Sequence, residues 1–277
     1  KLAYKIALEH FIEGGNNRVI LGTDGDFNVG VSTESALEKL IEEKRESGVY
    51  LSVLGFGSGN LKDNRMESLA DTGNGIYYYI DSILEAKKVF VSELGASLVT
   101  IAKDVKLQIE FNPSEVKGYR LIGYENRVMS YDDFYDNEKD AGDIGAGHEM
   151  VVFYEIIRAG STEEIDEREF EAVEELKYSD GLLDDLATLK IRYKNPVNDI
   201  GEEIEFVISN TSSVLTTTDF NFAACVIEFG LLLRDSEYKG EMTYDDVIAL
   251  AENNLGLDTH GYRSEFLELV EIAKLLD

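Results

Sequence analysis

Acidic and amide side chains recur at every second position of a short turn. Asp24, Asp26 and Asn28 are separated by Gly25 and Phe27, and a short apolar run at 19–21 precedes them. Such a run predicts a buried strand of a parallel sheet, and open α/β sheets bind their ligands at the carboxyl ends of the strands. Because Mg²⁺ and Ca²⁺ prefer oxygen ligands, Asp24 and Asp26 are candidate ligands of a divalent metal.

Two other interpretations of this turn compete with metal binding. An EF-hand is rejected, because Gly30 comes one residue too late, Glu34 comes one residue too early, and a strand precedes the loop instead of a helix. The second alternative is that Asp26 and Asn28 only hydrogen-bond to the backbone of their own turn. From these residues alone, metal binding and turn stabilisation both stay open.

A second glycine-rich turn suggests a dinucleotide site. Gly55, Gly57 and Gly59 follow a predicted strand, and Asp81 stands after the next strand, about where a ribose-binding acid is expected. However, the position of the third glycine in that fingerprint is occupied by Asn60, and this glycine allows the helix to pack closely on the strand. We therefore do not predict a nucleotide site.

The elements that would position these turns alternate between helix and strand over residues 1–97. Apolar periodicity predicts helices at 2–12, 33–47, 62–71 and 82–97, and strands at 18–23, 49–54 and 76–80. Strands that alternate with helices form a parallel sheet with flanking helices. The strand at 18–23 is expected to be covered on both faces.

Residues 98–277 have a different pattern, typical of an α+β region. Strands are predicted at 105–111, 118–124, 149–158, 187–193 and 203–208, and helices at 219–234, 244–253 and 262–276. In strand 105–111 apolar and polar residues alternate, and Lys106, Gln108 and Glu110 form its polar face. The strands predict an antiparallel β layer, followed by three helices of which the first, apolar nearly all round, should be central and buried. The glycine-rich segment 140–150 reads as a loop.

Composition narrows the classes of function. The chain has 277 residues, a formal net charge of −29 and 44% hydrophobic residues, so it is a globular and strongly acidic protein. This charge disfavours binding to nucleic acid and to anionic membranes, and no apolar run is long enough to span a membrane. The single cysteine, Cys225, is expected to be a small buried hydrophobe without a redox role.

The remaining polar candidates do not predict an enzyme. His148 stands without a second histidine or cysteine at metal-ligand spacing, and His260 and Arg263 are expected to cap or pack a helix start. None of the common hydrolase, metalloprotease or nucleotide-binding motifs occurs in the sequence.

Two long segments carry a family resemblance. ILGTDGDFNVG and YLSVLGFGSGNLKDNRMESLADTGNGIYYYI resemble the second half of a von Willebrand factor A (VWA) domain, whereas FNFAACVIEFGLLLRDSEYKG and LAENNLGLDTHGYRSEFLELV resemble the C-terminal region that follows this domain in certain bacterial proteins. The resemblance implies a Rossmann-like VWA half at 1–97 and a family-specific α+β domain at 98–277. It also implies the sheet order 3-2-1-4-5-6, with the strands of this chain corresponding to 4-5-6, so strand 18–23 is expected to be an apolar edge here, where the intact domain has a central neighbour.

The resemblance further implies a metal-ion-dependent adhesion site in the intact domain, occupied by Mg²⁺, Mn²⁺ or Ca²⁺. In that family the cation is held by an Asp-x-Ser-x-Ser turn, a threonine and the aspartate of a T-D-G turn. Asp24 corresponds to the aspartate of the T-D-G turn. No Asp-x-Ser-x-Ser occurs here, and residues 2–12 look like the helix after the threonine loop. We therefore expect the chain to begin inside the domain and to bind metal weakly or not at all by itself.

The function expected from the resemblance is a non-enzymatic, adhesion-type module that binds a protein ligand through the metal. The first alternative is a metal-independent scaffold or interaction protein of the bacterial cell envelope, and the second, ranked last, is a metal-assisted hydrolase that uses Asp24 and Asp26. For the location of the protein, the family resemblance suggests that it is in the bacterial cell envelope or is secreted. The missing N-terminal half of the domain, in this polypeptide or in a separate chain, is a further expected partner.

Overall fold

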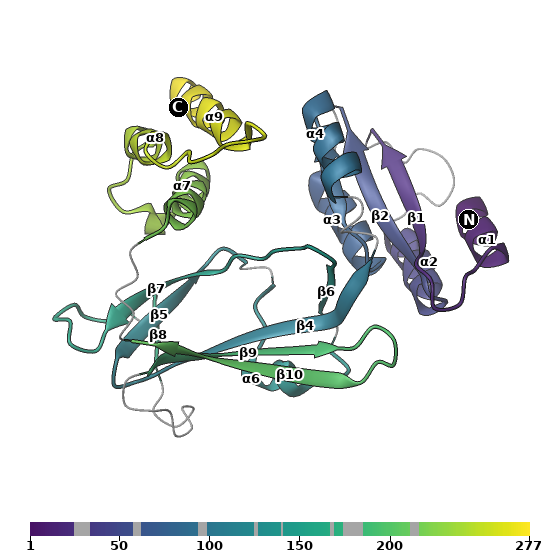
Figure 1. Cartoon of the computed structure of the whole chain (residues 1–277), viewed down its shortest axis with the longest axis horizontal. Helices are drawn as coiled ribbons and strands as arrows, with labels where there is room; N and C mark the ends of the chain where they lie inside the picture. The colour runs from purple at the N-terminus through teal and green to yellow at the C-terminus, as the bar shows by residue number, and fades with distance from the viewer. Residues whose placement is uncertain are drawn as a thin grey trace. The chain divides into compact units, whose positions relative to one another are not determined.

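The computed structural model describes residues 1–24, 34–57, 62–93, 99–124, 127–139, 141–166, 169–173, 185–210 and 216–277 (Figure 1). These residues form two compact units that are interleaved along the chain. The first comprises Lys1–Gln108, Met129–Met150 and Lys190–Glu205, and the second comprises Ile109–Val128, Val151–Leu189 and Phe206–Asp277. The predicted division into domains at residues 1–97 and 98–277 stays a prediction.

The first unit contains a three-stranded parallel sheet in the order β1-β2-β3. Its strands are β1 (Asn17–Thr23), β2 (Val49–Phe56) and β3 (Tyr77–Ile80). The accompanying helices are α1 (Leu2–Glu9), α2 (Glu34–Glu46), α3 (Asp63–Thr72) and α4 (Ile83–Lys87), and α4 continues as a π-helix, η1 (Lys88–Glu93). The α/β class and this strand order agree with the sequence prediction, although the π-helical turn was not expected.

The core of this sheet lies on the central strand. Val49, Leu51 and Val53 of β2 are buried against Ile41 of α2 and Leu69 of α3. Because apolar side chains at every second position point to one face of a strand, these three residues supply a continuous surface for the helices. Burial of this surface is the main stabilising contribution to the parallel sheet.

Strand β1 departs from the expectation that it is covered on both faces. Ile20 is 44% exposed, and of the described strands only β2 pairs with β1. Helix α1 is also shorter than predicted, since it ends at Glu9; it buries Tyr4 but leaves Leu2 and Ile6 exposed. The expectation that β1 is covered on both faces was wrong for the face that carries Ile20, whereas Val19 and Leu21 on the other face pack against the core.

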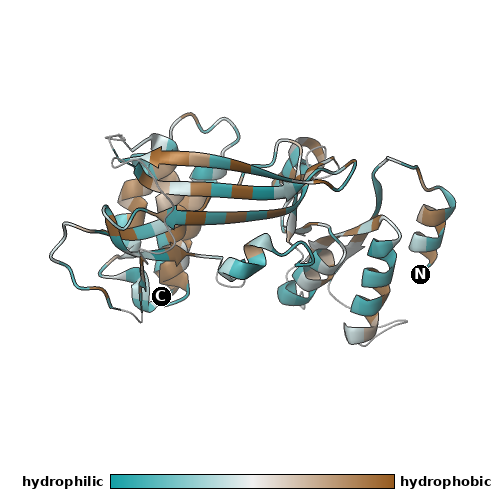
Figure 2. Ribbon diagram, turned by 90° about the horizontal axis from the view of Figure 1, so that it is seen from below, coloured by the Kyte–Doolittle hydropathy of each residue, from teal (hydrophilic) through white to brown (hydrophobic). Residues whose placement is uncertain are grey.

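Two further sheets follow, where the sequence predicted one antiparallel layer. A four-stranded sheet has the order β10-β9-β4-β6, and a three-stranded sheet has the order β7-β5-β8. The strands are β4 (Thr100–Phe111), β5 (Val116–Ile122), β6 (Gly142–Gly145), β7 (Phe153–Arg158), β8 (Glu171–Ala172), β9 (Asp185–Lys194) and β10 (Gly201–Ser209). β6 pairs antiparallel with β4, and β7 and β8 pair antiparallel with β5. Figure 2 shows hydrophobic and hydrophilic segments alternating along the long strands.

Three short elements between β5 and β9 were not predicted from the sequence. Strand β6 lies in the glycine-rich segment that was predicted to be a loop, and β8 has only two residues. The third is helix α6 (Tyr131–Tyr135), whose Ser130 and Asp133 form a reciprocal capping box. Such a cap satisfies two backbone N–H groups of the first turn, and it explains how a five-residue helix forms in a polar segment.

Three helices close the second unit: α7 (Thr218–Leu233), α8 (Tyr244–Glu252) and α9 (Tyr262–Leu276), with a 3₁₀ turn, η4 (Glu237–Lys239), between α7 and α8. Their common core contains Cys225, Val247 and Val270. The burial of Cys225 confirms its predicted position, and this burial raises the pKa of its thiol to about 11. Complete burial of α7 was a wrong prediction, because Phe220 and Leu233 are exposed. In the described part of the chain, no helix has the length and apolar character that crossing a membrane requires.

Candidate functional site

The carboxyl edge of the parallel sheet carries the predicted metal ligand Asp24. In the strand register, Thr23 of β1 is opposite Gly55 of β2, which in turn is opposite Tyr79 of β3. Asp24 therefore directly follows the last paired residue of β1, and its side chain is exposed. A carboxylate in this position can reach a cation or a ligand from solvent without any loss of packing.

The second predicted ligand, Asp26, lies outside the described residues, as do Asn28 and Gly59. Among the residues that the structure describes, no group of three or more histidine, cysteine, aspartate or glutamate side chains could hold a metal ion. Mg²⁺ needs nearly octahedral oxygen coordination, and Ca²⁺ takes six to eight oxygens. Asp24 can therefore be one ligand of such a site and needs further oxygen ligands to complete it.

The described residues at the end of β2 are held by a hydrogen bond from β3. Gly57 has a φ angle of +94°, a conformation that L residues with a Cβ atom rarely adopt. Its carbonyl oxygen accepts a hydrogen bond of 3.0 Å from the hydroxyl group of Tyr79. This bond joins the ends of β2 and β3 and fixes the edge of the sheet beyond the last paired residues.

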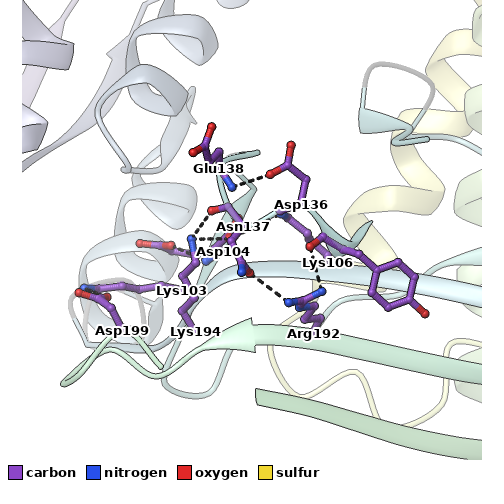
Figure 3. A network of polar contacts seen from close by, with 11 residues as sticks. Lys103, Asp104, Lys106, Asp136, Asn137, Glu138, Arg192, Lys194 and Asp199 are labelled. Carbon is purple, nitrogen blue, oxygen red and sulfur yellow. Dashed lines mark hydrogen bonds and ion pairs between the residues drawn. The ribbon is translucent and has the colours of Figure 1, made fainter. Parts of the chain in front are cut away.

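A second polar cluster lies on β4 and β9 of the same unit and was not predicted (Figure 3). The Asp104 carboxylate lies 2.9 Å from Lys194 Nζ and 3.6 Å from Lys106 Nζ. Lys106 is only 3% exposed, although the alternation of β4 placed it on the polar face. That expectation was wrong, because the segment after α6 covers this face of the strand.

The lysines of this cluster hold the covering segment through its backbone. Lys106 donates to the carbonyl oxygen of Asp136 at 2.5 Å, and Lys194 donates to that of Asn137 at 2.9 Å. Arg192 donates to the carbonyl oxygen of Tyr135 at 3.2 Å and to the Asn137 side chain at 3.1 Å. Since these cations donate to oxygen atoms of the covering segment, the cluster holds that segment against the strands.

Asp104 itself stands at an irregular position of β4. The pairing register with β6 shifts between Ala102 and Val105, and Asp104 has a φ angle of +51°. Its backbone N–H donates to Asp143 Oδ1 at 3.2 Å. This bulge turns the carboxylate toward the two lysines. The only signal in the sequence is an aspartate within a strand pattern, which is too weak to predict a bulge.

The prediction that His260 and Arg263 cap or pack the start of a helix agrees with the structure in its packing part, because the N-cap of α9 is Gly261 and has no side-chain cap hydrogen bond. Asp258 accepts hydrogen bonds from the backbone N–H groups of Arg263 and Ser264, which lowers the pKa of its carboxyl group. Arg263 donates to the carbonyl oxygen of Asn254, and its guanidinium group lies over the ring of Phe222. His260 stacks on Tyr262. These contacts order the start of α9.

Taken together, the described residues define an α/β protein with a three-stranded parallel sheet, an exposed carboxylate at the carboxyl edge of that sheet, and a following α+β region. The family described as "Uncharacterized protein YfbK, C-terminal" matches residues 96–276. The chain therefore belongs to this family, and the predicted membership of a bacterial family with a characteristic C-terminal region is confirmed.

A curated relative agrees with this assignment. The chain is 42% identical over 273 residues to "Uncharacterized protein YfbK" of Escherichia coli (strain K12). The match covers 99% of this chain and 47% of the relative, so the chain spans about half the length of the curated relative that it matches.

Two solved structures are also similar to the chain. A von Willebrand factor type A protein from Catenulispora acidiphila has 16% identity and a TM-score of 0.37, with 96% of this chain and 61% of that chain covered. The human COPII-coat protein Sec24c has 13% identity and a TM-score of 0.39, with 86% of this chain and 34% of that chain covered.

Proposed function

We propose that the chain is part of a non-enzymatic protein-binding module, in which a divalent cation on Asp24 joins the protein to a carboxylate of its partner. The observation that supports this proposal is the position of Asp24. It is an exposed carboxylate directly after β1, at the edge of a parallel sheet where such folds bind their ligands.

The coordination chemistry explains why a partner would be coupled to the metal. A single carboxylate supplies one or two of the oxygen ligands that Mg²⁺ or Ca²⁺ requires. Asp26 is the next candidate, through a bridging water molecule, and sequence beyond these 277 residues is proposed to supply further ligands. When one coordination position of the cation is filled by the partner, binding of the partner depends both on the cation and on a carboxylate of the partner.

The exposed edge of β1 supports a second part of the proposal. Within the described sheet β1 pairs on one side only, and Ile20 is 44% exposed. An apolar edge strand is a template for pairing with another strand. We infer that a strand from the other half of the same domain pairs with this edge and also brings the remaining metal ligands close to Asp24.

The experiment uses the full-length protein and compares partner capture in Mg²⁺ with capture in EDTA. The matched control for Asp24→Ala is Asp81→Ala, which removes an exposed carboxylate at the end of β3 in the same sheet. We expect Asp24→Ala to abolish the Mg²⁺-dependent part of the capture and Asp81→Ala to preserve it. If capture is equal in EDTA and unchanged by Asp24→Ala, the metal-dependent module is rejected.

That negative result would favour the first alternative, a metal-independent scaffold of the cell envelope. The second alternative, a metal-assisted hydrolase on Asp24 and Asp26, ranks last because carboxylates two residues apart on a turn usually diverge. A screen of phosphoester and ester substrates with Mg²⁺ and Mn²⁺ tests it directly. Hydrolysis that is lost in Asp24→Ala would replace the binding proposal.

A further inference from the structure

A cavity with a volume of about 310 Å³ lies in the second unit. It lies between strand β5, the segment at 169–171, and the C-terminal end of α7 with η4. A volume of roughly 300 Å³ is the lower limit for pockets that enclose a small ligand. The cavity is remote in sequence from Asp24 and is independent of the function proposed above.

One wall of the cavity contains an arginine that is held in a fixed orientation. The Arg120 side chain is 12% exposed. Its guanidinium group lies 4.1 Å from the ring centre of Tyr238 and 4.8 Å from that of Phe170. Aromatic rings attract a cation that lies over their faces, so Tyr238 and Phe170 together hold the guanidinium group in place.

The hydrogen bonds of Arg120 are incomplete. Nη2 is paired with Glu155, whereas Nε and Nη1 have no hydrogen-bond partner among the described residues. Nη1 lies 3.9 Å from Glu169, which is too far for a hydrogen bond. Because a buried donor without an acceptor costs free energy, such a group calls for a ligand, an ion or a water molecule as its partner.

The side chains that line the cavity carry charges of both signs, and Arg120 is also paired with Glu155 outside this lining. Arg120 and Arg234 contribute two cations, and Glu169 and Glu171 contribute two carboxylates. Glu171 is kept in place by the hydroxyl group of Tyr119, which donates to it at 2.8 Å. A simple anion would be repelled by the carboxylates, and a simple cation would be repelled by the arginines. A ligand that carries both charges is complementary to the whole set.

The rest of the lining is apolar. Leu121, Ile122, Val128 and Leu231 supply aliphatic surface beside the charged groups. From this arrangement we propose that the cavity binds a small zwitterion with an apolar side chain, namely a free α-amino acid of the phenylalanine or leucine type. Its carboxylate pairs with Arg120, its ammonium group pairs with Glu169 and Glu171, and its side chain contacts the aliphatic wall.

Calorimetric titration of the 277-residue chain with four probes tests the proposal. The probes are L-phenylalanine, L-leucine, N-acetyl-L-phenylalanine, which lacks the ammonium group, and L-phenylalaninamide, which lacks the carboxylate. We expect both free amino acids to bind at millimolar concentration or below, and each derivative of phenylalanine to bind roughly tenfold to a hundredfold more weakly, because each loses one charge-assisted set of hydrogen bonds.

Two variants and one control locate the site. Arg120→Met and Glu171→Gln should each weaken the binding of L-phenylalanine by about tenfold or more. Arg158→Met is the matched control, because Arg158 is an arginine of the neighbouring strand β7 and does not line the cavity. Thermal melting followed by circular dichroism checks that each variant is folded. If Arg120→Met does not fold, Glu171→Gln decides, since this carboxylate is exposed.

The proposal is overturned by any of three results. The first is that neither free amino acid binds at millimolar concentration. The second is that the amide or the acetylated derivative binds as tightly as L-phenylalanine, since the two charges then do not act together. The third is that binding persists unchanged in the folded variants, because the ligand then occupies another site.

Discussion

Asp104 lies between the side chains of two lysines, Lys106 and Lys194. A suitable substitution separates the contribution of its charge to stability from that of its positive φ angle. Its carboxylate is only 10% exposed and pairs with Lys106 and Lys194. Removing one member of a buried charged group leaves the other members uncompensated in a low-dielectric surrounding. Asparagine tolerates a positive φ angle about as well as aspartate does, so Asp104→Asn changes the charge and leaves the bulge intact.

We predict that Asp104→Asn lowers the free energy of unfolding by about 2 kcal/mol, the usual range for a hydrogen bond to a charged group. Urea denaturation measures the change. The control is Asp199→Asn, because Asp199 pairs with Lys103 at 3.1 Å but its side chain is 67% exposed. Exposed pairs contribute roughly 0–1 kcal/mol. Equal effects of the two substitutions would contradict the structural role assigned to the buried cluster.

Glu228 on α7 is an acid in an unfavourable position. Burial raises the pKa of its carboxyl group above the ordinary value of 4.5, and the nearby Asp246 of α8 raises it further. A raised folded-state pKa means that the folded protein binds more protons than the unfolded chain does. The contribution of Glu228 to the free energy of unfolding is therefore fully present below the pKa of the unfolded state. This contribution is lost as the pH rises through the pKa of the folded state.

The second prediction follows from this sign. Glu228→Gln should raise the melting temperature of the protein at pH 7, where the buried charge is present, and should change it little at pH 4. The control is Glu252→Gln, on the exposed side of α8. Differential scanning calorimetry at the two pH values is the measurement. A melting temperature that falls at pH 7 would show that Glu228 has a favourable partner in its charged form.

At the scale of elements, the turn between α3 and β3 depends on close approach of two backbone segments. A Cβ atom built on Gly75 would lie 1.6 Å from the carbonyl oxygen of Leu51. A backbone atom of the central strand cannot move aside without breaking the pairing of β2. The sequence shows only a glycine in a turn, and it does not reveal this contact.

We therefore predict that Gly75→Ala costs more than about 3 kcal/mol, the upper part of the range for overpacking in a well-packed site. Gly142→Ala is the control, because its added Cβ atom would meet no atom within 4 Å. Chemical denaturation compares the free energies of unfolding of the two variants. A Gly75→Ala protein as stable as the control would mean that the turn is looser than the structure shows.

Sequence periodicity predicted the parallel sheet more accurately than the antiparallel strands. β2 is buried on both faces, as a central parallel strand should be, and its boundaries follow from an apolar run. In β4 the alternation failed at Lys106, because the covering segment with α6 comes from a distant part of the sequence. The pattern of a strand shows which residues share a face, but it does not show what covers that face.

For the candidate metal site, the structure agrees with the predicted position of Asp24, and the role of Asp24 and Asp26 as metal ligands stays a prediction. The position of Asp24 at the end of β1 was predicted from the strand pattern, whereas the Arg120 cavity was not predicted at all. Its walls come from β5, the segment at 169–171 and α7, and no local spacing relates these segments. Tertiary packing creates such a site, so single-sequence patterns do not identify it.

At the scale of the whole molecule, the exposed edge of β1 should influence association. The isolated chain presents Ile20 on β1, together with Leu2 and Ile12 of the preceding segment, as exposed apolar residues. Since an unpaired apolar edge favours association, we predict that the isolated chain self-associates as its concentration rises and that Ile20→Lys reduces this association. Analytical ultracentrifugation measures it. A monomeric, monodisperse chain without the substitution would contradict the prediction.

The central claim, that Asp24 holds a divalent cation in the intact domain, is tested most directly by calorimetric titration of the full-length protein with Mg²⁺, Mn²⁺ and Ca²⁺. We predict saturable binding of at least one of these cations, its loss in Asp24→Ala, its retention in Asp81→Ala, and weak or no binding by the isolated chain. Binding that survives Asp24→Ala unchanged would contradict the account, because the cation would then occupy a different site.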